Sequence, residues 1–472
     1  MGMDTGQPEY ETNSNGVAHL QPGKYLAGIN IFTAATKTTP ASSTLGALTF
    51  RVSGHPRTVT ADARKGVPVQ MSLKVAGASQ QRLTATVCAP GPHIGRYGLL
   101  DIAAASADSS TRLYVIPSRS TPARFGVSSS WTGTDGREYL LARTRAGLPA
   151  GARFAFRARD LGTLALQVAS GASEGSSGIV EASSDTCAGA LSPQVPLSVP
   201  GRQAFQVSPG DWSANFAPND SNDDTTTLHQ KVTAHHRVTR TFGAAVRAPS
   251  RLSLPVFDQS LRGGKDFYFS TASLFADPTI LGGDECCSHG TIAVRGHGKV
   301  LKKVNFISSY GVFETALRTP GLYTVDISAT RQPPHQGVSP AILSTRIHLT
   351  WKFRATASDL QSAHTLAPVS VTTLKPAGLD LRNDAKPGVT TGVRFTIWPG
   401  QNVQSDPIKS VRVQASDDGG KTWHAAPVSG KALSRLARVK DPSAGFVTLR
   451  ITVTDIHGDS TVETIDRAYG IS

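Results

Sequence analysis

The 472-residue sequence has little of what marks several common classes of protein. Charged residues make up 17% of the chain, below the roughly 25% of typical globular proteins, which argues against a coiled coil. No run of about 18 apolar residues occurs, so we expect no membrane-spanning helix. Glycine and proline (45 and 29 residues) are too few for a disordered or collagen-like chain. Because apolar residues reach 39%, the sequence predicts several packed cores.

Cysteine is also scarce, with four residues at Cys88, Cys187, Cys286 and Cys287. Four cysteines can form two disulfides, and the sequence does not determine which cysteines pair. Adjacent cysteines close only a strained ring with each other. We therefore expect Cys286 and Cys287 to pair with Cys88 or Cys187 in an oxidised chain. The stretch 284–289 has ligand chemistry suited to zinc, but no second ligand pair lies at a suitable spacing.

The charge is unbalanced, with 48 Lys and Arg against 34 Asp and Glu, a net charge of +14. The positive residues stand mostly alone within alternating apolar runs, and the doubled sites are Arg64-Lys65 and Lys302-Lys303. A dispersed excess affects solubility and weak contact with anionic surfaces, such as teichoic acid or another wall polymer. We expect no nucleic-acid partner, because no element concentrates the charge.

The first 20 residues are polar and contain no apolar stretch of the kind found in secretory signals. They therefore predict no signal peptide.

Apolar and polar residues alternate along many short stretches, which is the pattern of half-buried β-strands. The runs are four to eight residues long and end at Gly, Pro, Asn, Asp or Ser. The clearest examples are residues 48–52, 67–73, 82–87, 153–157, 291–294, 346–353, 411–413 and 447–453. Helical patterns are rare, and 159–168 is expected to form a short helix.

Many short strands without intervening helices indicate an all-β chain. We expect several antiparallel β-sandwich modules in tandem, of the immunoglobulin, fibronectin or transthyretin kind. Ser, Gly, Asp and Asn gather at 170–184 and 217–227, which predicts long loops within a larger second module. The expected modules are residues 1–78, 79–248, 249–357 and 358–472, the last of them immunoglobulin-like.

Two patterns suggest a serine hydrolase, and both lack essential parts. Residues 171–175 match GxSxG around Ser173, but a flexible Ser/Gly stretch follows where a helix is needed. Asp4-Thr5-Gly6 and His289-Gly290-Thr291 stand in the order of a subtilisin-like triad, without the Gly-Thr-Ser block. A triad requires a rigid frame that brings its three groups together. We therefore expect no catalytic residue in this chain.

One acidic loop has oxygen ligands at alternate positions, as a calcium loop would. These candidate ligands are Asp220, Asn222 and Asp224. Thr225 stands where the loop glycine belongs, and Lys231 stands where the terminal glutamate belongs. Calcium is the one candidate cofactor, and a solvated acidic turn is the alternative.

The most specific short motif is S-x-D-x-G-x-T-W, formed by Ser416, Asp418, Gly420, Thr422 and Trp423. In such a motif the carboxylate and hydroxyls bond the backbone of a turn, glycine permits a positive φ, and tryptophan packs beneath. A β-propeller would carry several copies at a regular period, and this chain has one. The motif therefore predicts a hairpin turn and no glycosidase.

Several stretches together resemble the downstream, non-catalytic region of large secreted subtilisin-like serine peptidases of the actinobacterial type. The similarity is colinear and touches most of the chain, most specifically at the C-terminal end. It is found at residues 20–25, 62–69, 344–354, 411–423, 440–450 and 466–470. The peptidase domain of that family lies N-terminal to this region, so no catalytic residue is carried over.

The resemblance implies an extracellular, non-catalytic accessory or interaction region, with a peptidase domain or a cell-wall polymer as partner. One alternative is a module that binds carbohydrate or wall polymer, with Trp131, Trp212 and Trp423 as stacking candidates. The other alternative is a serine hydrolase with Ser173 as nucleophile. The oligomeric state is left open.

Overall fold

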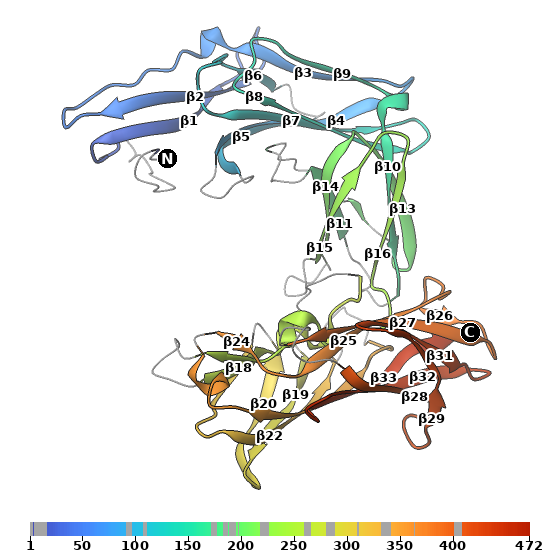
Figure 1. Cartoon of the computed structure of the whole chain (residues 1–472). Helices are drawn as coiled ribbons and strands as arrows, with labels where there is room; N and C mark the ends of the chain where they lie inside the picture. The colour runs from blue at the N-terminus through green and yellow to red at the C-terminus, as the bar shows by residue number, and fades with distance from the viewer. Residues whose placement is uncertain are drawn as a thin grey trace.

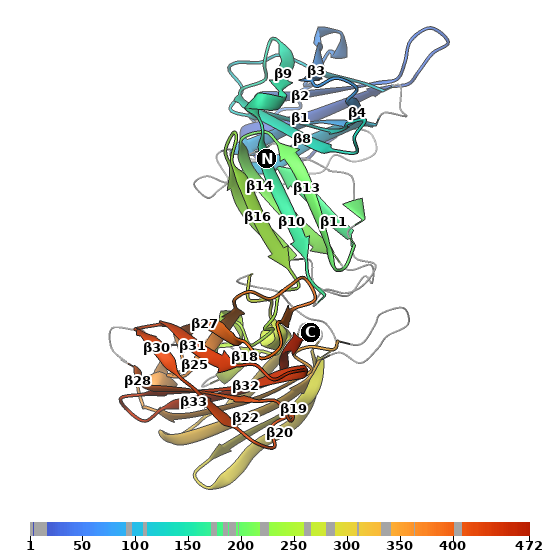
Figure 2. The same cartoon turned by 90° about the vertical axis from the view of Figure 1, so that its right-hand side faces the viewer.

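The computed structural model describes residues 3, 17–90, 97–106, 111–170, 177–182, 187, 195–196, 198–217, 226–258, 266–279, 288–308, 311–331, 341–362, 364–400 and 408–472. Nearly all regular structure is β-strand, as predicted. The chain forms an N-terminal sandwich, a narrow central module and a larger C-terminal body (Figures 1 and 2).

The N-terminal sandwich packs a five-stranded sheet against part of a seven-stranded sheet around one hydrophobic cluster. The five-stranded sheet has the order β1 (Gly23–Thr33), β2 (Ser42–Val52), β6 (Arg112–Val115), β3 (Val67–Lys74), β9 (Ala152–Arg157). Its partners are β5 (Tyr97–Ser106), β4 (Ser79–Pro90), β7 (Arg124–Thr132) and β8 (Glu138–Ala146). Two of the pairs, β2 with β6 and β3 with β9, are parallel.

The central module continues the seven-stranded sheet and has its own cluster. The continuing strands are β13 (Gly201–Val207), β10 (Gly162–Val168) and β16 (Arg237–Phe242). A four-stranded sheet accompanies them, in the order β12 (Val195–Pro196), β11 (Ser177–Ala182), β14 (Gly210–Ala217), β15 (Thr226–Val232). Figure 2 shows these strands as a neck between the two larger parts.

The C-terminal body is built on a nine-stranded sheet that includes β26 (Asp384–Ala385) beside β33. Its main order is β20 (Lys299–Ser308), β19 (Ser288–Gly296), β22 (Gly321–Thr330), β23 (Arg346–Ala355), β33 (Ser460–Ile471), β32 (Gly445–Asp455), β28 (Ile408–Ser416), β29 (His424–Ala426). Figure 1 places this sheet on the side of the body away from the central module.

Two four-stranded sheets cover the inner face of the nine-stranded sheet, and one cluster fills the space between the layers. The first runs β21 (Val312–Ala316), β18 (Asp266–Ser270), β17 (Val256–Asp258), β24 (Thr365–Leu366). The second runs β25 (Ser370–Pro376), β27 (Thr390–Pro399), β31 (Ser434–Lys440), β30 (Val428–Lys431). Because β23 pairs with β33, residues 249–357 and 358–472 share one sheet.

Among the described residues, helical structure is limited to short 3-10 turns, and none of these is long and apolar enough to cross a membrane. The turns are η1 (Ala63–Lys65), η2 (Ala158–Asp160), η4 (Arg251–Ser253), η5 (Ala272–Phe275) and η6 (Asp359–Gln361). The short helix expected over 159–168 is wrong, because β10 occupies 162–168. Leu164, Leu166 and Val168 alternate into the central cluster, which is the period of a strand.

Two buried side chains, Asn383 and Asp277, take part in the hydrogen bonds between the central module and the C-terminal body. Asn383 donates from Nδ2 to the carbonyl of Gly243 and accepts from the amide of Ala245, both over 2.9 Å. Asp277 accepts from the amide of Gly243 over 2.6 Å. The limits predicted at 78, 248 and 357 stay predictions, since shared sheets do not decide which parts fold independently.

Candidate functional site

The outer face of the nine-stranded sheet collects basic side chains that lie between Arg295 and Arg450 in the sequence. Successive strand residues point to opposite faces, so the residues between the buried ones share the outer surface. In β23, Ile347, Leu349, Trp351 and Phe353 are buried. We call the surface of alternate residues the basic face; its charged members are Arg295, Lys303, Asp326, Arg346, Lys352, Arg354, Arg412, Arg450 and Asp466.

The strand register places these side chains in rows across the sheet. Arg295 lies opposite Thr324, and Thr324 lies opposite Lys352. On the far side, Arg450 lies opposite Thr464, and Arg412 lies opposite Thr452. Neighbouring strands are about 4.8 Å apart and alternate residues of one strand about 6.6 Å apart. The rows therefore form a grid of cations and small hydroxyl side chains.

Positive charge dominates the basic face, with seven Lys or Arg residues and two Asp residues. Arg295 pairs with Asp326, and Arg346 pairs with Asp466 over 3.0 Å. In the part of the chain that the structure describes, Lys303, Lys352, Arg354 and Arg412 have no ion-pair partner. Exposed cations without partners remain available to external anions, with a strength that salt reduces.

The core beneath the basic face holds the sheet in place with buried polar contacts. Trp351 donates from Nε1 to the carbonyl of Ser370 over 3.1 Å. Glu463 accepts a hydrogen bond from the Thr372 amide over 2.9 Å and another from the Thr372 hydroxyl. Burial raises the pKa of Glu463 to about 8, because a charged carboxylate is costly away from water. This carboxyl group links two sheets and does not reach the surface.

A second buried polar group lies at the other end of the same core. Asp441 accepts hydrogen bonds from the Thr391 hydroxyl over 2.6 Å and from the Tyr469 hydroxyl over 2.7 Å. Burial, followed by the bond to Asp441, raises the pKa of Tyr469 well above its ordinary value. Both groups bind protein atoms, so their shifted pKa values have a structural cause.

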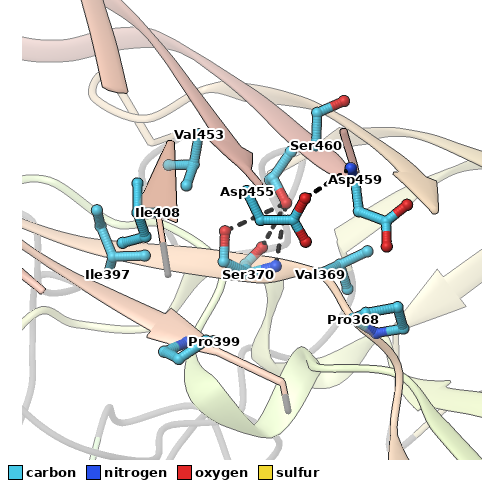
Figure 3. Close-up of a pocket in the computed structure, with 11 residues that line it drawn as sticks. Pro368, Val369, Ser370, Ile397, Pro399, Ile408, Val453, Asp455, Asp459 and Ser460 are labelled. Carbon is cyan, nitrogen blue, oxygen red and sulfur yellow. Dashed lines mark hydrogen bonds between the residues drawn. The ribbon is translucent and has the colours of Figure 1, made fainter. Parts of the chain in front are cut away.

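A small cavity at the end of the C-terminal sandwich is too small to be a ligand site. It is lined by Ser370, Asp455, Asp459 and Thr461 among others, and its volume is about 40 Å³. Asp455 accepts from the amide of Asp459 over 2.8 Å, and the Ser370 amide donates to the Thr461 hydroxyl over 3.1 Å. Figure 3 shows Asp455, Asp459 and Ser370 at this cavity. Small-molecule sites usually measure about 300–1,000 Å³, so this space suits one or two waters.

The hairpin turn predicted at the S-x-D-x-G-x-T-W motif joins β28 to β29. Asp418 accepts from the Thr422 amide and hydroxyl over 2.9 and 2.6 Å, and from the Ser416 hydroxyl over 2.7 Å. These bonds hold the pKa of Asp418 well below its usual range. Gly420 has a positive φ of 89°, and its carbonyl accepts from Nε1 of Trp423. The motif organises a turn at the sheet edge.

The three tryptophans named as stacking candidates are occupied by protein contacts. Trp212 is buried in the central cluster. Trp131 is half-buried against the N-terminal cluster and donates to the Ser129 hydroxyl over 2.8 Å. The guanidinium of Arg450 lies 3.8 Å from the ring centre of Trp423. Burial therefore closes Trp212 to a sugar, and Arg450 covers one face of Trp423.

The disulfide corrects the expected pairing, because Cys88 is bonded to Cys187, with their Cα atoms 5.9 Å apart. The expectation that the adjacent pair would use these partners is wrong. The fold brings the segment of Cys187 against β4, where its carbonyl accepts from the Thr86 hydroxyl. Cys286 and Cys287 lie outside the described residues.

Of the motifs considered for catalysis and calcium, the structure describes the one around His289. His289 lies in β19, exposed on the outer side of the sheet. Ser173, Asp4 and the candidate calcium ligands Asp220, Asn222 and Asp224 lie outside the described residues. Among the residues with described positions, no three His, Cys, Asp or Glu side chains gather as a metal site.

The basic face is not predicted from the sequence, because its positive residues stand singly and far apart along the chain. The signal was present in the run RIHLTWKFR, where Arg346, Lys352 and Arg354 alternate with buried residues. An apolar strand that carries cations at every second position must display them on one side. That several such strands are neighbours is a property of the tertiary structure.

The chain matches no protein-family model, and no curated protein matches it. One similar solved structure is Escherichia coli alpha-2-macroglobulin activated by porcine elastase, with 10% identity over 83% of this chain and a TM-score of 0.17. Another is the Bacillus anthracis TIE protein, with 10% identity over 86% of this chain and 72% of that one and a TM-score of 0.15. The chain spans 41% of the alpha-2-macroglobulin chain. At such TM-scores neither likeness bears on function.

Proposed function

We propose that this chain is a non-catalytic interaction module that binds closely spaced anionic groups through its basic face. The observation that carries the proposal is the excess of cations on one exposed sheet face, four of them without ion-pair partners in the described structure. A flat sheet with cations in rows fits an extended array of phosphates or carboxylates better than a single small anion. Long-range electrostatic attraction between the cations and the anionic groups then strengthens each contact.

The resemblance to the downstream region of secreted subtilisin-like peptidases supports an accessory role and an extracellular location. A cell-wall polymer rich in phosphate has the required chemistry. We propose no hydrolase activity, since the groups with shifted pKa values at the C-terminal core bond to protein atoms. A serine-directed fluorophosphonate probe that labelled the purified chain would contradict this assignment.

Binding to immobilised inorganic polyphosphate tests the proposal directly. The face variant is Lys352→Ser/Arg354→Ser/Arg412→Ser. The matched control removes three exposed cations from the N-terminal sandwich, Lys74→Ser/Arg112→Ser/Arg153→Ser, so both variants have the same net charge. We expect the face variant to lose at least tenfold in affinity at low salt and the control to lose less than threefold.

Salt dependence provides a second readout. Affinity of the unmodified chain should fall as salt rises, and the slope should be shallower in the face variant because fewer cations contact the anion. An equal loss in both variants would show that net charge alone governs binding. That result would contradict the proposal that the basic face is the anion-binding site.

A further inference from the structure

Two histidines share the basic face with its Lys and Arg residues. His348 lies in β23 between the buried Ile347 and Leu349, and its side chain is exposed. His289 is exposed in β19 on the same side as Arg295, because the two are an even number of positions apart. Histidine changes its charge between pH 5 and 8, whereas Lys and Arg stay charged over that range. The basic face therefore contains two members whose charge depends on pH.

The strand register places both histidines around Arg346. Arg346 and His348 are alternate residues of β23, about 6.6 Å apart along the strand. His289 lies opposite Thr330, and Thr330 lies opposite Arg346. Two strand spacings of about 4.8 Å therefore separate His289 from Arg346. We call His289, Arg346 and His348 the histidine end of the basic face.

The histidine end differs in charge from the other end of β23. Lys352 and Arg354 lie on the same side of this strand and have no ion-pair partner in the described part of the chain. Arg346, by contrast, is paired with Asp466 over 3.0 Å. At neutral pH the positive charge is therefore greatest around Lys352 and Arg354, and a carboxylate weakens it at the histidine end.

The strands beside His348 present two hydroxyl side chains and two acidic ones. Ser328 on β22 and Thr464 on β33 lie directly opposite His348. Asp326 and Asp466 lie two residues further along the same strands, and each already forms an ion pair with an arginine. His348 has no hydrogen-bond or ion-pair partner among the described residues. A proton on its ring therefore adds a positive charge that remains available to an external anion.

The strand residues next to His289 are uncharged. Ile307 of β20 lies opposite His289 on one side, and Thr330 of β22 lies opposite it on the other. Thr291 is the next residue of β19 on the same face. Where the structure describes the chain, His289 likewise has no hydrogen-bond or ion-pair partner. Its exposed ring can therefore contact an external anion directly.

We propose that acidification extends the anion-binding surface of the basic face to its histidine end, an inference that rests on the proposed binding of anions by that face. At neutral pH and above, an extended polyanion binds at the end formed by Lys352 and Arg354. In acid, protonation of His289 and His348 adds two cations beside Arg346. The polyanion then contacts both ends of β23, and each added cation strengthens its binding.

Binding to immobilised long-chain polyphosphate at pH 5.5 and at pH 8 tests the proposal. The internal phosphates of this polymer stay ionised over that range, so the charge of the probe changes little. We expect the affinity of the full chain to rise about tenfold from pH 8 to pH 5.5 at low salt. The variant His289→Gln/His348→Gln should lose most of this rise. If the variant kept the rise in full, the inference would be wrong.

The matched control accounts for the histidines elsewhere in the chain. The sequence has 13 histidines, so acid raises the net charge at other places as well. The control His55→Gln/His236→Gln removes two exposed histidines from the N-terminal and central parts. It should keep the rise in affinity, because neither residue belongs to the basic face. Equal losses in the two double variants would show that net charge alone governs the response, and would reject the inference.

A variant that gains charge keeps the test independent of any loss of folding. His289→Arg/His348→Arg places permanent cations at the histidine end, so it should bind polyphosphate at pH 8 more tightly than the unmodified chain does. His55→Arg/His236→Arg has the same net charge and should show no such gain. Equal affinity of these two variants at pH 8 would contradict the proposal.

Proton uptake on binding gives a further readout. Calorimetry near pH 6.5, in buffers of different ionisation enthalpy, should show that the unmodified chain takes up protons when it binds polyphosphate. His289→Gln/His348→Gln should take up fewer protons. Polyphosphate binding that is the same at both pH values would reject the inference and leave the proposed function standing. Absence of binding at both pH values would reject both.

Discussion

The N-terminal sandwich and the C-terminal body are stabilised by different means. Aromatic rings meet in chains through the C-terminal core, where Phe353 lies 5.6 Å from Phe267 and 6.1 Å from Tyr323 between ring centres. The N-terminal cluster is richer in small side chains, among them Ala47, Ala85, Ala89, Ala103, Ala123 and Ala152. A disulfide joins its strand β4 to Cys187, 99 residues along the chain.

Both sandwiches thus bury a hydrophobic core, and the N-terminal one also has a covalent link to the central module. Large rings bury more apolar area than alanines do, so a ring-filled core depends less on a cross-link. A cross-link acts mainly on the unfolded chain and adds stability without extra burial. Each difference leads to a measurable contrast.

The largest effect is expected from removing the disulfide. Cys88→Ser/Cys187→Ser should destabilise the N-terminal and central parts by roughly 4–5 kcal/mol, as expected for a closed loop of about 100 residues. Differential scanning calorimetry should show the transition of those parts moving down while that of the C-terminal body stays in place. An equal shift of the entire profile would mean that the halves unfold as one unit.

Removing one aromatic ring should destabilise the C-terminal body by almost as much as loss of the disulfide destabilises the other parts. Phe353→Ala is expected to lower its free energy of unfolding by about 3–5 kcal/mol, since a cavity and several ring contacts are involved. Phe125→Ala is the matched change in the N-terminal core, where the described residues give Phe125 no ring partner. Urea titration should give the larger loss for Phe353→Ala. Equal losses would remove the contrast between the cores.

The buried carboxyl groups should differ in their pH dependence. The pKa of Glu463 is raised to about 8 by burial, above its ordinary value of 4.5, so the folded state holds a proton that the unfolded state loses. Its stabilising contribution is complete below pH 4.5 and decreases by about 1.4 kcal/mol per pH unit up to pH 8. Glu463→Gln should remove this slope in stability measured from pH 5 to 9.

A half-buried glutamate in the N-terminal sandwich serves as the control for that series. Burial also raises the pKa of Glu138, and the Thr132 hydroxyl donates to it over 3.1 Å. Glu138→Gln should leave most of the slope in place, because water still reaches this group. A slope that survives Glu463→Gln and disappears in Glu138→Gln would reverse the assignment.

The smallest effect is expected at the β28–β29 turn. Asp418→Ala removes acceptors for the Lys421 and Thr422 amides at an exposed edge. The C-terminal transition should shift downward by less than it does in Phe353→Ala, with faster amide exchange at Thr422. Because the pKa of Asp418 is depressed, its contribution should persist at neutral pH and be lost only in strong acid. Unchanged amide exchange would show that the turn holds without the carboxylate.

The local elements of this protein could be predicted because the residues that determine each of them lie close together in the sequence. Alternation over 346–353 predicted the strand that the structure has at Arg346–Ala355. The spacing of Ser416, Asp418 and Thr422 predicted the turn and its hydrogen bonds, since a short side chain can only reach nearby backbone. The expected helix at 159–168 was wrong because neighbouring strands on both sides of β10 override weak local preference.

Contacts between segments far apart in the sequence could not be predicted in this way. The pairing of Arg346 with Asp466 joins residues 120 positions apart. The choice of Cys187 as partner of Cys88 depends on how the central module folds back on β4. Neither is encoded by spacing along the chain.

The sequence by itself determined the all-β class, because alternation sets which side chains each strand buries and which it exposes. It also determined that the strand at 346–355 carries its cations, Arg346, Lys352 and Arg354, on one side. The order of strands in the nine-stranded sheet was decided by the tertiary structure alone. Only that order, set by packing between residues far apart in sequence, turns scattered positive charges into one surface.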